Sequence, residues 1–111
     1  MAWRLRLAAQ ARADIQEAVA WSRDNFGAMQ ADRYLLAIQA TTAVLRQSPL
    51  GPRTRARDDL APGLRVLHMR RAGHRGRHLL IYRVAEPDTV MVLRVLHDAM
   101  DPARHLPSRA R

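Results

Sequence analysis

The chain has 111 residues, a length that suits one domain with one hydrophobic core and leaves too little chain for a second. It contains no cysteine, which excludes a disulfide framework and a thiolate metal site. The formal net charge is +9, and all 19 basic residues are arginine, so the protein should attract phosphate groups or an acidic protein partner.

The first expected element is a strand over residues 2–7. Trp3, Leu5 and Leu7 lie on one face of an extended segment and arginines on the other, which is the period of a half-exposed strand. A signal peptide would need a continuous apolar run, and no later segment has transmembrane length. We therefore expect a soluble, cytoplasmic protein with no membrane association.

Two helices should follow and form an antiparallel hairpin. The first covers residues 9–24, and Gly27 is suited to end it because glycine readily adopts the left-handed conformation past a helix C-terminus. The second covers residues 28–47, and Pro49 ends it. The connection is short, which favours antiparallel packing. The expected buried stripes are Ala11, Ile15, Ala18, Val19 and Ser22 in the first helix and Ala31, Leu35, Ile38, Thr42 and Leu45 in the second.

The rest of the chain predicts a polar loop and three strands. Residues 49–63 are the least apolar segment, and we expect them to be mobile. The strands are 64–70, 77–84 and 90–97, and successive apolar residues in the last two predict that both faces are covered. The fold class is therefore α+β, of order β-α-α-β-β-β, with the helical hairpin on a mostly antiparallel four-stranded sheet. Residues 1–111 should form this single domain, with about the last five as a flexible tail.

Polar side chains gather where the last strand ends. Arg94 and His97 lie at the end of this strand, and Asp101 and Arg104 follow in the tail. The junction of a strand and a loop is a common place for binding or chemistry. The simplest interpretation of His97 is a hydrogen bond to the turn that follows. His74 and His78 are four residues apart with Gly76 between them in a predicted hairpin, a geometry that gives no metal site.

Several local sequences, in this order, resemble the RelE/ParE toxin superfamily, and its ParE-like branch in particular. The resemblance covers nearly the whole chain, and it implies the toxin of a type II toxin–antitoxin pair, neutralised by a small antitoxin that wraps around it. ParE-like members poison DNA gyrase, whereas RelE-like members cut messenger RNA in the ribosome. The matching pieces are Ala13-Asp14-Ile15, Phe26-Gly27, Ala31-Asp32-Arg33-Tyr34, Leu64-Arg65, His78-Leu79-Leu80-Ile81-Tyr82-Arg83, Arg94-Val95-Leu96-His97 and His105-Leu106.

The fold alone does not choose between these activities. A metal-independent nuclease needs a base, cationic donors and an acid around one phosphate. The chain has no lysine, and Glu17 and Glu86 are poorly placed for a base on a helix and in a hairpin turn. The alternative of a ribosome-dependent endonuclease would use His97, Tyr82, Arg65, Arg83 and Arg94. Tyr82 is more simply a half-buried strand tyrosine.

The preferred hypothesis is a gyrase-inhibiting toxin that needs no catalytic group, no cofactor and no metal. A third class, a plain nucleic-acid-binding domain, is weaker because no DNA-reading or RNA-reading motif is present. Convergence of the nuclease candidates on one cleft would favour the enzyme, and scatter would favour the binding toxin. The predicted target contacts are Arg94, His97, Asp101 and Arg104, and the predicted antitoxin contacts are Trp21, Arg53, Arg55, Arg57 and Arg65. The antitoxin itself should have a DNA-binding N-terminus and an acidic or amphipathic C-terminal segment.

Overall fold

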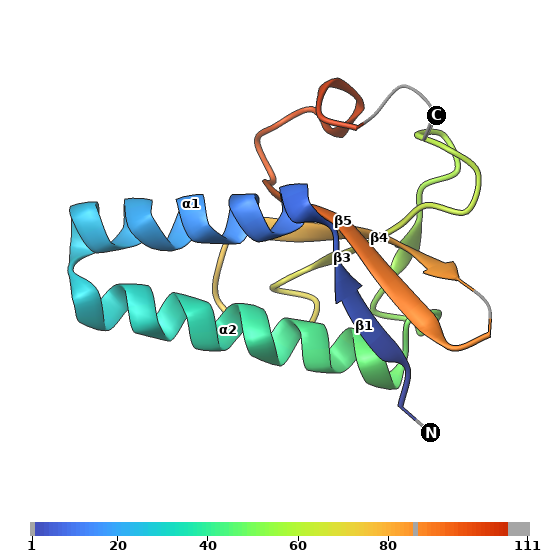
Figure 1. Cartoon of the computed structure of the whole chain (residues 1–111), viewed down its shortest axis with the longest axis horizontal. Coiled ribbons are helices and arrows are strands. Elements are labelled where there is room, and N and C mark those ends of the chain that lie inside the picture. The colour runs from blue at the N-terminus through green and yellow to red at the C-terminus, as the bar shows by residue number, and fades with distance from the viewer. Residues whose placement is uncertain (1, 86, 107–111) are drawn as a thin grey trace.

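A computed structural model describes residues 2–85 and 87–106, so the predicted tail at 107–111 lies outside the described residues. The two helices form a hairpin that packs on a sheet, and the turn between them projects beyond the sheet (Figure 1). No helix in the described part of the chain combines the length and the apolar character needed to cross a membrane. The elements are β1 (Arg4–Leu7), α1 (Ala9–Phe26), α2 (Ala28–Gln47), β2 (Arg55–Ala56), β3 (Arg65–His68), β4 (His78–Ala85), β5 (Thr89–His97) and the short helix η1 (Pro102–Arg104).

The five strands form one mixed sheet in the order β1-β5-β4-β3-β2. β1 runs parallel to β5, with Leu5 opposite Val90, and all other neighbours are antiparallel. The predicted α+β class and the mostly antiparallel sheet are confirmed. The strand count differs by one because Arg55 and Ala56 pair with β3. A strand of two residues is too short to show an alternating pattern in the sequence.

The helices are held as a hairpin by a glycine turn. Gly27 has a φ of +94°, and its amide donates to the carbonyl of Arg23 at 2.9 Å, which closes the last turn of α1. The helix reaches Phe26, two residues past its predicted end. The buried stripe of α1 is more polar than predicted, because it contains Asp14 beside Ala11 and Ser22.

The sheet separates two hydrophobic cores, as the successive apolar residues of β4 and β5 predicted. Leu80, Tyr82 and Val92 pack on the side of the helices, together with Ile38 and Leu45 of α2. The opposite core contains Ile81 and Leu96 and is covered by residues outside the strands and the two long helices, namely Leu60, Ala61, Leu64, Ala103 and Leu106. The C-terminal segment therefore belongs to the fold, because it closes the second face.

The loop before β3 is anchored more firmly than its composition predicted. Leu60 and Ala61 are buried in the second core, and Thr54 is buried at the start of β2. The Tyr82 hydroxyl, fully buried, donates to the carbonyl of Pro49, and Arg65 donates to the Thr54 hydroxyl at 2.7 Å. Leu60 and Ala61 supply apolar anchors that the composition of the segment did not predict, whereas Leu50 and Ala56 remain exposed. The mobility of this segment stays a prediction.

Candidate functional site

A cleft of about 600 Å³ lies where the helical hairpin passes the ends of β4 and β5. Its walls include Trp21 and Phe26 from α1 and Tyr34 from α2, and His78 and His97 face them from the sheet. His78 and His97 are opposite each other in the register of β4 and β5, so the pairing of the strands brings the two imidazoles together. Of the site residues that the sequence predicted, this cleft contains Trp21, Arg94 and His97.

A buried ion pair forms the floor of the cleft. Arg94 donates from Nε and Nη2 to the carboxylate of Asp14 at 2.8 and 2.9 Å, and the side chains are only 15% and 7% exposed. Asp14 also accepts from the amide of Val95 at 2.9 Å. A third donor of Arg94 reaches the carbonyl of His105. The pair therefore joins α1, β5 and the C-terminal segment, and it leaves Arg94 few donors for an external partner.

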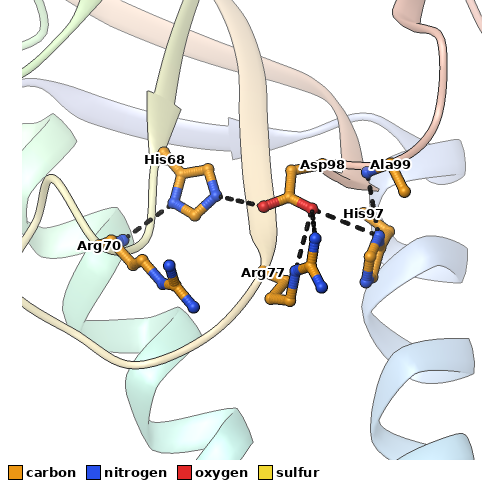
Figure 2. A network of polar contacts seen from close by, with 6 residues as sticks. All are labelled: His68, Arg70, Arg77, His97, Asp98 and Ala99. Carbon is orange, nitrogen blue, oxygen red and sulfur yellow. Dashed lines mark hydrogen bonds and ion pairs between the residues drawn. The ribbon is translucent and has the colours of Figure 1, made fainter.

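A second network is centred on Asp98, just after β5 (Figure 2). His68 Nε2 lies 3.0 Å from one carboxylate oxygen, and Arg77 Nε and Nη2 lie 3.2 and 3.1 Å from the other. His97 Nδ1 is 3.5 Å from the same oxygen as Arg77. Hydrogen bonds from His68 and Arg77 lower the pKa of Asp98, so this carboxylate stays ionised at neutral pH. Asp98 therefore links residues at the end of β3, just before β4 and at the end of β5.

Backbone contacts assign the tautomers of the two histidines in this network. The amide of Ala99 donates to His97 Nδ1 at 3.0 Å, and the amide of Arg70 donates to His68 Nδ1 at 3.1 Å. A ring nitrogen that accepts from an amide carries no proton, so each neutral ring is protonated at Nε2. His68 donates that proton to the carboxylate of Asp98, whereas the side chain of His97 is 40% exposed. His97 therefore hydrogen-bonds the following turn, as predicted, but its partner is the amide of Ala99 and not the expected Asp98 or Asp101.

Two polar atoms in the wall of the cleft are buried without a partner in the described part of the chain. They are the Tyr34 hydroxyl and His78 Nδ1, and the two rings meet edge to face at a centroid distance of 5.3 Å. His78 also meets His97 edge to face at 5.4 Å. Burial raises the pKa of Tyr34 and, with the nearby His97, lowers the pKa of His78 to about 4. Both groups are neutral at pH 7.

The lowered pKa of His78 predicts a loss of stability in mild acid. Protonation favours the unfolded chain, so this contribution is complete above pH 6.5 and declines as the pH falls toward 4. His97 opposes protonation, while Asp98 and Asp14 favour it weakly. Because the ring is partly solvated, we expect a loss of about 1 to 2 kcal/mol between pH 7 and pH 4.5.

Urea unfolding of the wild type and of His78→Phe at these two pH values measures the effect. Phenylalanine keeps the edge-to-face packing and removes the titrating group, so the variant should lose less than half as much stability. Asp98 does not interfere, because the pKa of its carboxyl is lowered and its own contribution is lost only below pH 3.8. An equal loss in both proteins would show that another group is responsible.

The five nuclease candidates do not converge. His97 lines the cleft and Arg94 lies beneath it, but Tyr82 and Arg65 hold the loop before β3. Arg83 is exposed toward the other end of β4, opposite Met91. The hydroxyl of Tyr82 donates to a backbone carbonyl, and burial raises the pKa of this phenol, so it is a poor proton donor for chemistry.

The predicted antitoxin contacts also lie apart. Trp21 is 59% exposed near the end of α1 and packs edge to face on Phe26 at 5.6 Å. Arg53 and Arg55 are exposed at and before β2, on the outer edge of the sheet, and Arg57 forms paired hydrogen bonds with Asp59 at 2.8 and 2.9 Å. The sequence missed the buried Asp14, the Asp98 network and the Tyr34 and His78 pair. An acidic residue within the apolar stripe of a helix was the available signal for Asp14.

A helical hairpin on a mixed sheet is the fold of the RelE/ParE toxins. A chain of the chromosomal ParDE toxin–antitoxin (TA) system from P. aeruginosa shares it with a TM-score of 0.69 at 21% identity, covering 86% of this chain and 95% of that chain. A chain of the toxin-antitoxin complex RelBE2 from Mycobacterium tuberculosis has a TM-score of 0.60 at 25% identity, covering 87% of this chain and 99% of that chain.

The sequence comparisons narrow this class to one family. Residues 5–102 match the family model of the ParE toxin of the type II toxin-antitoxin system parDE. Toxin ParE1 of Mycobacterium tuberculosis is 36% identical over 107 residues, which cover 96% of this chain and 100% of the relative. Toxin ParE1 of Caulobacter vibrioides is 31% identical over 101 residues, which cover 91% and 95%. The chain belongs to the ParE toxin family.

Proposed function

We propose that this ParE-family toxin inhibits DNA gyrase by binding it and that a cognate antitoxin neutralises it. The observation that supports this proposal best is the scatter of the nuclease candidates. Tyr82, Arg65 and Arg94 are each committed to internal hydrogen bonds, so the five predicted candidates do not surround one point. A toxin that acts by binding needs only a surface.

The proposed gyrase-binding surface is the end of β5 and the segment after it. His97 offers its Nε2 proton there, and Arg104 is exposed on η1. Asp101 shapes the segment, because its carboxylate accepts from the amide of Ala103 at 3.1 Å and caps η1. Arg94 stabilises this segment by donating a hydrogen bond to the carbonyl of His105. The predicted target contacts therefore divide into two that offer donors, the partly exposed His97 and the exposed Arg104, and two that hold the segment, Arg94 and Asp101.

The proposed antitoxin-binding surface is formed by the exposed apolar side chains of the helical hairpin. Four large apolar side chains are more than half exposed there, and such a concentration is typical of a protein interface. The hairpin carries four arginines and four acidic residues, so charge does not dominate this surface. An amphipathic antitoxin segment could lay its apolar face on it. The four side chains are Trp21, Phe26, Met29 and Leu36.

Substitution of His97 tests the mechanism. If His97 only donates a hydrogen bond to gyrase, His97→Ala should weaken the inhibition of supercoiling by about fivefold, which corresponds to ~1 kcal/mol. His97→Gln, which keeps a donor near the position of Nε2, should retain most of the inhibition. A catalytic acid would instead lose a hundredfold or more in rate with either substitution.

The assay uses purified gyrase with relaxed plasmid, together with translation in a cell-free extract as a control. Supercoiling should be inhibited while translation continues and the messenger RNA stays intact. Induced cells should form filaments and show DNA-damage signalling. Message cleavage that both His97 variants abolish would replace the proposal with a ribosome-dependent nuclease.

A further inference from the structure

The positive charge of this protein is concentrated in one part of the chain. Residues 60–85 contain six arginines and no aspartate or glutamate, which gives this segment a charge of +6 out of the total of +9. The helical hairpin, residues 9–47, is longer and neutral. A general preference for arginine over lysine explains the residue type, but it does not explain why acidic residues are missing here. The segment comprises β3, β4 and the turn between them.

Four of these arginines lie in or beside the turn between β3 and β4, and three are free of carboxylates. Arg70, Arg71 and Arg75 are exposed, and none of them forms an ion pair within residues 2–85 and 87–106. Arg77 is the exception, since it pairs with Asp98. Like charges so close together repel, and an anionic partner would remove that repulsion.

The turn is fixed and does not behave as a loose loop. Met69 and Ala72 are buried in the core, and the amide of His74 donates to the carbonyl of Met69 at 3.0 Å. Gly76 has a φ of +142°, and a Cβ there would lie 2.7 Å from the sulfur of Met69, so the chain closes tightly over this residue. Arg71 Nη2 donates to the carbonyl of Pro52 at 3.2 Å. The arginines therefore project from a fixed backbone, which lowers the entropy lost on binding.

We propose that this turn binds the phosphate backbone of duplex DNA through Arg70, Arg71 and Arg75. The inference rests on the proposed function, because it places the toxin against DNA that gyrase holds. Duplex DNA carries a negative charge about every 1.7 Å, which matches a dense array of guanidinium groups. A protein partner would be anchored by apolar side chains, yet the exposed large apolar residues of the described chain all lie outside residues 70–77.

The turn also continues the proposed gyrase-binding surface. Figure 2 shows Arg70 and Arg77 on the two limbs of the turn, with His68 and Asp98 between them and His97 beside Asp98. Asp98 thus connects the two ends of the turn, through His68 and Arg77, to the end of β5. A target that presents protein and DNA side by side could contact the end of β5 with its protein part and the arginine-rich turn with its DNA. The proposed antitoxin surface adjoins the end of β5, because Trp21 and Phe26 line the same cleft as His97.

The test is the salt dependence of binding to a fluorescein-labelled random-sequence duplex of about 20 base pairs, measured by anisotropy with the full chain. The triple variant Arg70→Gln, Arg71→Gln, Arg75→Gln should bind at least about tenfold more weakly at low salt. Its plot of log K against log salt should be shallower by about 2 to 3, because each phosphate contact contributes about 0.9. The matched control is Arg12→Gln, Arg23→Gln, Arg33→Gln on the neutral hairpin, which removes the same charge and should change the affinity less than about threefold.

Two results would overturn the inference. An equal loss of DNA affinity in both triple variants would mean that net charge alone attracts DNA. Tighter binding of poly-glutamate than of the duplex would indicate an acidic protein partner. Thermal unfolding checks that both variants fold, as expected for exposed arginines. A supercoiling assay separates this inference from the proposed function. Inhibition of gyrase by both variants as strong as that by the wild type would overturn only the inference, whereas no inhibition by the wild type would overturn only the proposed function.

Discussion

Replacing Asp14 by asparagine should destabilise the folded protein by about 3 to 5 kcal/mol, the typical cost of leaving one member of a buried ion pair without its partner. The substitution keeps the size of the side chain but removes the charge that three donors share. Arg94 cannot turn to water easily, because the carbonyl of His105 also holds it. Urea unfolding at pH 7, which gives the midpoint and the slope, measures the change.

Two controls make this prediction specific. Asp24→Asn removes the same charge from an exposed position of the same helix, and it should change the stability by less than about 0.5 kcal/mol. The double variant Asp14→Asn, Arg94→Met should recover much of the loss, because replacing both ions of a buried pair by less polar groups is often nearly neutral. A loss in Asp14→Asn no larger than that in Asp24→Asn would show that the pair contributes little.

The elements that the sequence predicted are those whose signals are local. Alternation at Trp3, Leu5 and Leu7 identifies a strand without knowledge of its neighbours, and Gly27 and Pro49 mark helix ends through their own backbone preferences. The resemblance to ParE toxins came from the order of such pieces. The family and the α+β class were therefore accessible from the sequence.

The features that the sequence did not predict depend on partners far along the chain. The burial of Asp14 is explained only by its ion pair with Arg94, which is 80 residues away in the sequence. A bulge in β5 places Val92 and Val95 in the same core, although strict alternation would put them on opposite faces. Tyr82 was assigned to possible chemistry because its hydroxyl partner, the carbonyl of Pro49, belongs to no motif. Tertiary contacts decided each of these cases.

Replacing Trp21 by alanine should weaken the complex with the antitoxin by about a hundredfold to a thousandfold, which corresponds to ~2 to 4 kcal/mol for a central aromatic anchor. Trp21 is 59% exposed and Phe26, which packs on it, is 65% exposed, so an amphipathic partner helix would remove much of this apolar area from water. Tryptophan is also among the residues that most often dominate interface energies. The probe is the product of the short open reading frame that we expect beside this gene, and its affinity is measured by titration calorimetry.

The matched control is Leu50→Ala, which removes a side chain that is 62% exposed in the connection after α2, away from the tip of the hairpin. It should change the affinity by less than about threefold, because a single exposed apolar residue outside an interface contributes little to binding. The heat-capacity change of binding gives a second measure, since Trp21→Ala should make it less negative in proportion to the apolar area lost. Equal effects of the two variants would place the antitoxin elsewhere, and the outer edge of the sheet with Arg53 and Arg55 would then be the next surface to test. Because the hairpin is electrically neutral, the affinity should depend only weakly on salt, whereas binding at the arginine-rich turn would weaken steeply as salt is added.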